Sequence, residues 1–217
     1  MERLYMTSDG SHTLWDSERG QWYHSIHGAI DESMRVFLEL GLNDVATRTS
    51  KIKLLEMGFG TGLNVLLTLL EAEKLAVRVE YTSIEAYPIG PNDWSKLNYD
   101  DVLKTHFLTQ IHELSWEETH DLNSYLSLKK CKVMLQDYQA NELFDLVYFD
   151  AYAPSAQPEL WPVDVFSKLA SMMVIGGVLT TYCSKSEVRR NLQAAGFKVE
   201  KHPGPFRKRE VIRAIKE

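Results

Sequence analysis

A glycine-rich segment is the feature of the sequence with the clearest chemical meaning. Residues 56–64 read EMGFGTGLN, with glycines at Gly58, Gly60 and Gly62. Glycines between a strand and a helix let the backbone approach a ligand and leave the first helical N–H groups free to bind it. The G-x-G-x-G spacing, with the Glu56 carboxylate two residues before the first glycine, differs from the G-x-G-x-x-G of dinucleotide-binding folds. The carboxylate favours a cofactor with a cationic end, so S-adenosylmethionine fits and NAD fits poorly. The alternative is that the glycines only shape a tight turn.

Acidic side chains also follow the next two apolar segments. Glu85 closes the second predicted strand, 23 residues after Gly62, and a carboxylate at that position can accept two hydrogen bonds from ribose hydroxyls. Asp137 and Tyr138 follow a third apolar segment, where Asp137 can accept a hydrogen bond from an adenine amino group and Tyr138 can stack on the adenine ring. The alternatives are a strand-end carboxylate in solvent for Glu85 and a helix cap for Asp137.

A third acidic position is expected to meet the substrate. Residues 144–154 read FDLVYFDAYAP, so Asp150 ends an apolar run and precedes Tyr152 and a proline. In an open parallel sheet, ligands bind at the carboxyl ends of the strands. An acidic acceptor among aromatic side chains is suited to hold an amine and take its proton. Asp145 comes earlier on the strand and is expected to be structural.

Residues near the two ends of the chain provide weaker signals. Tyr23 and His24 could line the pocket as part of a lid. His24 and His27 are three residues apart, but such a pair without a third ligand is not expected to bind a metal. A basic cluster near the C-terminus is expected either to be solvated or to contact phosphates. It consists of Arg207, Lys208 and Arg209.

The composition is that of an ordinary globular protein with an uneven charge. Of the 217 residues, 44% are hydrophobic and 25% are charged, and the net charge is −6. The segment 185–217 carries ten basic and four acidic side chains, so basic charge is concentrated there. A net acidic protein of this kind is not a general polyanion binder, but its basic segment can still contact a nucleic acid locally.

Other features of the sequence exclude four further classes of protein. The two cysteines, Cys131 and Cys183, are far apart, which excludes a disulfide scaffold and a Cys-rich zinc site and suits a reducing compartment. The first residues lack the apolar core of a signal peptide. The longest uncharged stretch, residues 169–184, is too short to span a membrane. We therefore expect a soluble, cytoplasmic protein without membrane contact.

The hydrophobic pattern predicts one doubly wound α/β domain behind a small N-terminal extension. Residues 1–45 are expected to form the extension, in which 3–7 pair with 12–15 and a helix over 29–40 ends at Gly41. Residues 46–217 are expected to form the domain, because strand and helix patterns alternate there. Its strands are predicted at 51–57, 77–84, 132–135, 143–149, 178–183, 197–202 and 210–215, and its helices at 63–74, 101–116, 162–173 and 186–195. The last two strands are expected to be antiparallel and to end a mostly parallel sheet.

Four segments resemble, in the same order, motifs of the MnmC-like methyltransferases. They are 56–64 (EMGFGTGLN), 83–88 (SIEAYP), 150–154 (DAYAP) and 204–210 (GPFRKRE). This family comprises the methyltransferase half of the bifunctional tRNA 5-methylaminomethyl-2-thiouridine biosynthesis protein and its stand-alone relatives. The resemblance runs from about residue 51 to the C-terminus and implies a Rossmann-like class I methyltransferase fold. The oxidase half of the bifunctional relatives is expected to be absent from this chain.

The resemblance also implies a reaction and a set of site residues. The family uses S-adenosylmethionine to methylate the primary amine of 5-aminomethyl-2-thiouridine at the tRNA wobble position, which implies the tRNA anticodon region as partner and no metal. Carried onto this sequence, the methionine part of the cofactor would be held by Glu56, Gly58, Gly60, Gly62 and Asn64, the ribose by Glu85, the adenine side by Asp137 and the substrate amine by Asp150. Beside these positions we expect Tyr138 to contact the cofactor, and Tyr23, Tyr152 and the basic cluster 207–209 to contact the substrate. Two other functions are a methyltransferase of small-molecule amines and a non-catalytic nucleotide-binding or RNA-binding module.

Overall fold

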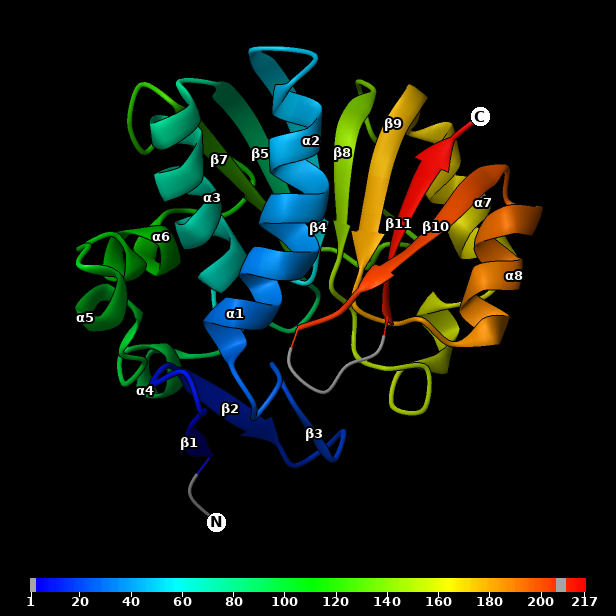
Figure 1. Cartoon of the computed structure of the whole chain (residues 1–217). Coiled ribbons are helices and arrows are strands. Elements are labelled where there is room, and N and C mark those ends of the chain that lie inside the picture. Colours follow the sequence, from blue (N-terminus) through cyan, green and yellow to red (C-terminus); the bar gives the residue numbers. More distant parts are fainter. Residues whose placement is uncertain (1–2, 206–209) are drawn as a thin grey trace.

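The computed structural model describes residues 3–205 and 210–217 and centres on an eight-stranded sheet. The strands are β4 (Lys51–Met57), β5 (Arg78–Ile84), β6 (Thr119–Asp121), β7 (Leu126–Cys131), β8 (Phe144–Phe149), β9 (Met173–Thr181), β10 (Phe197–Pro203) and β11 (Glu210–Lys216). They lie in the order β10-β11-β9-β8-β4-β5-β7-β6 (Figure 1). The pairs joining β7, β5, β4, β8 and β9 are parallel. Strand β11 lies antiparallel between β9 and β10, so the predicted mostly parallel sheet with an antiparallel last strand is confirmed.

Helices cover both faces of this sheet. They are α3 (Leu63–Leu75), α4 (Pro91–Trp94), α5 (Tyr99–Leu103), α6 (Leu108–Glu113), the 3₁₀ turn η2 (Pro158–Leu160), α7 (Val163–Ser171) and α8 (Ser186–Ala194). In β4, Ile52 and Leu54 pack into the core on the α3 side, whereas Leu55 and Met57 pack on the α7 side. Because successive side chains of a strand point to opposite faces, Glu56 faces α3 together with Leu54. The Glu56 carboxyl is therefore surrounded by side chains on the α3 side of the sheet.

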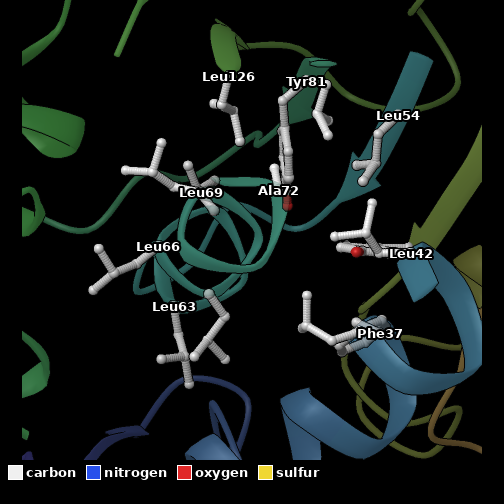
Figure 2. Packing of buried hydrophobic residues seen from close by; sticks show 14 of the residues in the cluster. Phe37, Leu42, Leu54, Leu63, Leu66, Leu69, Ala72, Tyr81 and Leu126 are labelled. Atoms are coloured by element: carbon white, nitrogen blue, oxygen red, sulfur yellow. The ribbon is translucent and has the colours of Figure 1, made fainter. Parts of the chain in front are cut away.

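Helix α3 is the most deeply packed helix on its face. Leu63, Leu66 and Leu69 point outward on one side of the helix, and Leu54, Tyr81 and Leu126 reach toward it from three neighbouring strands (Figure 2). Each fully buried side chain of this size contributes about 1.5–3 kcal/mol to the free energy of unfolding. The packing fixes the first turn of α3, and with it the glycine-rich loop that precedes the helix.

The N-terminal helix is longer than predicted. It runs without interruption from α1 (Ala29–Ser33) through a π-helical segment, η1 (Met34–Leu42), into α2 (Asn43–Ala46). The prediction that Gly41 ends the helix is wrong. A Cβ at Gly41 would lie 3.2 Å from side-chain atoms of Leu146 and Tyr148, so the glycine lets the helix approach the sheet closely. Gly41 is therefore needed for close packing of the helix against the sheet, and it does not end the helix.

Two predicted elements between β5 and β8 are also wrong. Residues 101–116 form two short helices instead of one, because Lys104 is left-handed and Asp100 accepts a hydrogen bond from the backbone N–H of Leu108 at the start of α6. The third strand occupies Leu126–Cys131 instead of 132–135. The strand contains Lys129 and Lys130, and charged side chains are not expected in a buried strand. Lys130 is nevertheless buried within β7, where its ammonium donates hydrogen bonds to the carbonyls of Ile111 and His112 at 2.8 Å each.

A separate three-stranded sheet forms the N-terminal extension. It consists of β1 (Leu4–Met6), β2 (His12–Asp16) and β3 (Gln21–Trp22), and the predicted pairing of the first two strands is confirmed. This sheet lies below the carboxyl ends of the parallel strands (Figure 1). The side-chain oxygen of Asn98 accepts from the backbone N–H of His12 at 2.8 Å, and Arg3 pairs with Asp93 at 2.8 Å. These contacts anchor the extension over the end of the sheet where ligands bind in such folds.

Candidate active site

A cavity of about 800 Å³ lies between the extension and the carboxyl ends of the parallel strands. Its walls come from residues 16–26 of the extension, from the glycine-rich loop, and from the segments that follow β5 and β8. This volume is in the range typical of sites for small molecules. The position is the one expected for ligands in an open α/β sheet.

The glycine-rich loop is shaped by backbone conformations that favour glycine. Gly58, Gly60 and Gly62 have φ angles of +95°, +48° and +76°. A Cβ at Gly58 would lie 2.8 Å from the carbonyl oxygen of Asp150, so the loop and the end of β8 are in direct backbone contact. A Cβ at Gly60 would lie 3.2 Å from the Tyr23 ring. The loop is therefore enclosed between the sheet and the extension.

Glu85 connects the glycine-rich loop to the next strand end. Its carboxylate accepts hydrogen bonds from the backbone N–H groups of Gly60, at 3.1 Å, and Tyr87, at 2.8 Å. The side chain is half-buried and lines the cavity. Its oxygens are thus held in one orientation at the edge of β5.

Four polar residues meet where β4, β5, α3 and the end of β8 converge. The side-chain amide of Asn64 donates to Oδ2 of Asp150 at 2.9 Å, and Ser83 donates to Glu56 at 2.6 Å. Asn64 and the half-buried Asp150 line the cavity, whereas Glu56 is only 1% exposed and lies behind them. Burial, reinforced by the negative charge of Asp150, raises the pKa of Glu56 to about 8. The Glu56 carboxyl therefore holds its proton more tightly than an ordinary glutamate does.

An aromatic wall faces Asp150 from the extension and from the segment after β8. The rings of Tyr23 and Tyr152 are 5.4 Å apart, and the Tyr152 hydroxyl donates to Asp16 at 3.1 Å. The Tyr182 hydroxyl donates to the carbonyl of Ala151 at 2.9 Å, and the Trp161 indole donates to the carbonyl of Tyr152 at 2.8 Å. These bonds fix the segment that carries Asp150 and Tyr152.

The structure brings together eight of the residues singled out from the sequence. The cavity is lined by Gly58, Gly60, Asn64, Glu85, Asp150, Tyr23, His24 and Tyr152. Glu56 lies behind the lining, and Gly62 is the left-handed residue that precedes α3. The basic cluster 207–209 lies outside the described residues.

Asp137 and Tyr138 lie away from the cavity as the described residues form it. Asp137 is exposed and Tyr138 packs against the hydrophobic cluster on the α7 side of the sheet. Their assignment depended on a strand at 132–135, but β7 ends at Cys131, whose carbonyl accepts from the backbone N–H of Glu85 at 3.0 Å. The strand end next to Glu85 is therefore six residues earlier than the position of Asp137.

Several lining residues had not been singled out from the sequence. They are Asp16, Arg19, Glu32, Tyr87 and Tyr182. The position of Tyr87, two residues after Glu85, was a sequence signal that it lies near the cavity. Arg19 had no such signal in the sequence, because residues 17–20 have the composition of an ordinary exposed turn.

The charge of the cavity fits a cationic ligand. Its lining carries six carboxylates against two arginines, Arg3 and Arg19. A cleft with this excess of negative charge attracts cations. The glycine backbone and the fixed Glu85 carboxylate suit a nucleoside with a positively charged chain, so the residues present fit S-adenosylmethionine. No group of three or more metal-ligating His, Cys, Asp or Glu side chains occurs within 3–205 and 210–217, and no helix in those ranges is long and apolar enough to cross a membrane.

Known proteins resemble this chain in sequence and in structure. It is 32% identical to the tRNA 5-methylaminomethyl-2-thiouridine biosynthesis bifunctional protein MnmC of Pseudomonas fluorescens over 88% of this chain, and 32% identical to that of Magnetococcus marinus over 90%. The chain spans about a third of the length of these relatives (31%). The crystal structure of MNMC2 from Aquifex aeolicus matches the whole chain and 70% of that protein with a TM-score of 0.83 at 27% identity. S-adenosylmethionine-bound CalS10, an amino pentose methyltransferase from Micromonospora echinaspora, shares the fold, with a TM-score of 0.51 at 13% identity over 92% of this chain and 93% of its own.

The family model for S-adenosyl-L-methionine-dependent methyltransferases matches residues 93–217. The match covers more than half of the chain and includes β8, Asp150 and the antiparallel last strands. The predicted fold class, family resemblance and cofactor are confirmed. The chain belongs to this family of S-adenosyl-L-methionine-dependent methyltransferases.

Proposed function

We propose that the protein methylates the primary amine of 5-aminomethyl-2-thiouridine at the wobble position of tRNA. The names of the relatives support this substrate, because they are tRNA 5-methylaminomethyl-2-thiouridine biosynthesis proteins. The observation that carries the proposal is the placement of Asp150. Its carboxylate lines a cavity rich in carboxylates, and Asn64 fixes one of its oxygens at 2.9 Å. A primary amine is cationic in water, so it would be attracted to such a cavity.

In this proposal the cofactor is held by the glycine-rich loop and its neighbours. The backbone at Gly58 and Gly60 would lie against the methionine part, and Glu85 would accept hydrogen bonds from the ribose hydroxyls. Bound S-adenosylmethionine supplies an electrophilic methyl group on a sulfonium. Glu56 lies behind the lining and is 1% exposed, so in this proposal it does not contact the cofactor directly.

Asp150 would prepare the nucleophile. Its carboxylate takes a proton from the substrate ammonium, which frees the nitrogen lone pair. That lone pair would then accept the methyl group that bound S-adenosylmethionine supplies. The product would be a secondary ammonium that keeps its two remaining N–H protons until it reaches solvent. Tyr23 and Tyr152 would keep water away from the amine and orient it. Positioning and electrostatics of this kind account for the catalysis, and no covalent intermediate with the protein is needed.

The Asp150→Asn variant tests the role of this carboxylate. It keeps the shape of the side chain and removes its capacity to accept a proton. We expect the rate of methyl transfer to tRNA to fall by about 10²-fold or more, while the Kd for S-adenosylmethionine, measured by calorimetry, stays within about threefold of the original. Asp164→Asn, at an exposed position at the start of α7, is the matched control and should retain full activity. Equal loss of cofactor binding and turnover would contradict the role given to Asp150.

The substrate itself is tested with tRNA from cells that lack this protein. Nucleoside analysis should show accumulated 5-aminomethyl-2-thiouridine, and the purified protein with labelled cofactor should convert it to the methylaminomethyl form. Transfer to free amines without transfer to this tRNA would identify a small-molecule methyltransferase instead. An unchanged nucleoside profile in those cells would also contradict the proposal.

A further inference from the structure

An arginine between two tyrosines joins three separate segments at the mouth of the cavity. The guanidinium carbon of Arg19 lies 5.9 Å from the centre of the Tyr87 ring and 5.4 Å from that of Tyr152. Arg19 belongs to the turn between β2 and β3, Tyr87 follows β5, and Tyr152 follows β8. Asp16 ties the group together, because it accepts from the Tyr152 hydroxyl at 3.1 Å and lies 4.0 Å from Arg19. All four side chains line the cavity.

Tyr87 differs from the other tyrosines of this group in its exposure. Its exposed fraction is 62%, whereas Tyr23 and Tyr152 are half-buried. Its backbone is fixed, since its N–H donates to Glu85 at 2.8 Å and Pro88 follows it. A single exposed aromatic residue needs no explanation in general. This one lines a cavity, has a guanidinium near its ring and has its backbone held in place.

We propose that Tyr87, supported by Arg19, is a stacking platform for an RNA base that neighbours the methylated uridine. The inference rests on the proposed function. Asp150 lies at the end of β8 inside the cavity, so a uridine whose amine reaches it must leave the stack of its loop. The neighbouring base then loses a stacking partner. An aromatic ring at the mouth of the cavity replaces that partner, and single-stranded RNA is commonly bound in this way by tyrosine and arginine planes.

Binding of an anticodon stem–loop RNA measures this platform directly. In fluorescence anisotropy at constant salt, Tyr87→Ala should weaken RNA binding by about 5- to 100-fold, the range for loss of one base–aromatic stack. Tyr87→Phe and Tyr87→Trp keep a flat ring and should restore binding to near the original value. Ile175→Ala removes a still more exposed apolar side chain (73%) near the start of β9, at the opposite end of the sheet, and should bind RNA normally.

Arg19 acts through the ring that it supports, as a positioning residue. Arg19→Lys keeps the charge but loses the planar group. We expect this variant to weaken RNA binding about as much as Arg19→Ala does, while the salt dependence of binding in Arg19→Lys stays at the original slope. Arg48→Ala is the control, because Arg48 also pairs with an aspartate, Asp44, and lies at the opposite end of the molecule, bonded to the carbonyl of Gly176.

The measurements separate this inference from its alternatives. RNA binding that is indifferent to Tyr87→Ala overturns it. A change in the Kd for S-adenosylmethionine in Tyr87→Ala, with RNA binding intact, would mean that the ring contacts the adenine of the cofactor instead. If the original protein binds the stem–loop through Tyr87 but transfers no methyl group to tRNA, the proposed function fails and the platform stands. If the protein transfers the methyl group to tRNA but RNA binding does not need Tyr87, the stacking platform is refuted and the proposed function stands.

Discussion

Two carboxyl groups near the floor of the cavity have opposite environments. Asp150 is half-buried, lines the cavity and accepts from Asn64, whereas Glu56 is 1% exposed and accepts from Ser83. Burial raises the pKa of Glu56 to about 8, and the charge on Asp150 reinforces the shift. A carboxyl that keeps its proton near neutral pH acts as a neutral group. The proposed role of base therefore goes to Asp150, which lines the cavity, and not to Glu56.

A protonated Glu56 can also supply a hydrogen-bond donor to the side chain of Asn64. Oδ1 of Asn64 is buried and has no hydrogen-bond partner within the described part of the chain. Tyr81, Ser83 and Tyr148 face Glu56 from β5 and β8, and Asn64 faces it from α3. A carboxyl that carries its proton can donate to the Asn64 oxygen, which leaves the amide N–H for Asp150. We therefore expect Glu56 to orient Asn64 instead of holding the cofactor.

Glu56→Gln tests this assignment through the pH dependence of stability. Because the pKa of Glu56 is raised from 4.5 to about 8 on folding, the folded state holds the proton that the unfolded chain releases. The free energy of unfolding therefore falls as pH rises from about 4.5 through about 8. Glutamine stays neutral, so the variant escapes this loss. Its Tm relative to the original protein should rise between pH 5 and pH 9, by about 4 °C or more.

The control for this series is Glu159→Gln, which removes an exposed carboxylate in η2. Its Tm should follow that of the original protein at every pH. Parallel Tm curves for Glu56→Gln and the original protein would refute a proton held on Glu56 in the folded state.

At the scale of elements, the glycine-rich loop and the end of β8 act as one unit. The backbone N–H of Asp150 donates to the carbonyl of Met57 at 3.0 Å, and the Asp150 carbonyl occupies the space where a Gly58 side chain would begin. Any shift of the loop therefore moves Asp150. The proposed cofactor-binding loop and the proposed base are positioned by the same backbone contacts.

Gly58→Ala should disturb both. An added Cβ at Gly58 would lie 2.8 Å from the Asp150 carbonyl oxygen, and the φ of +95° adds strain. We expect cofactor affinity to fall at least about tenfold and turnover to fall further, in calorimetry and transfer assays at a temperature where the variant is folded. The comparison variant is Gly176→Ala, whose φ is +77° with nothing within 4 Å of its added Cβ. Gly176→Ala introduces only the backbone strain of a positive φ, about 1–2 kcal/mol, without a steric clash. It should keep the original affinity for S-adenosylmethionine.

The same scale shows which parts of the site could be predicted from the sequence. Glu85 and Asp150 could be placed because β8 is mainly apolar, β5 alternates buried and partly exposed side chains, and parallel strands end at one edge of a sheet. The end of β7 could not, since Lys129 and Lys130 interrupt its apolar pattern and the pairing of Lys130 with helix carbonyls depends on the tertiary fold. Arg19 was missed for a related reason. Its role depends on contacts with Tyr87 and Tyr152, which are far away in the sequence.

Acidic and basic side chains are concentrated in different parts of the molecule. The cavity is dominated by carboxylates, which suit a cationic cofactor and a cationic amine. The basic excess lies in residues 185–217, with ten basic against four acidic side chains. Pro203 and Glu210, which flank the basic cluster 207–209, lie opposite each other at the edge of the sheet where β9 also ends. The net charge of −6 therefore hides a segment with an excess of basic side chains.

Salt dependence of RNA binding tests this division of charge. If Arg207, Lys208 and Arg209 contact phosphates, replacing all three by alanine should reduce the slope of log K against log salt by about 2, since each phosphate contact on single-stranded RNA contributes about 0.7. Replacing Lys51, Lys53 and Arg78 by alanine changes the net charge equally, but these residues lie at the amino ends of β4 and β5. That control should keep the original slope, and both variants should bind S-adenosylmethionine normally. Equal slopes in all three proteins would mean that the basic cluster does not contact RNA, and an equal loss in both variants would mean that only the overall charge matters.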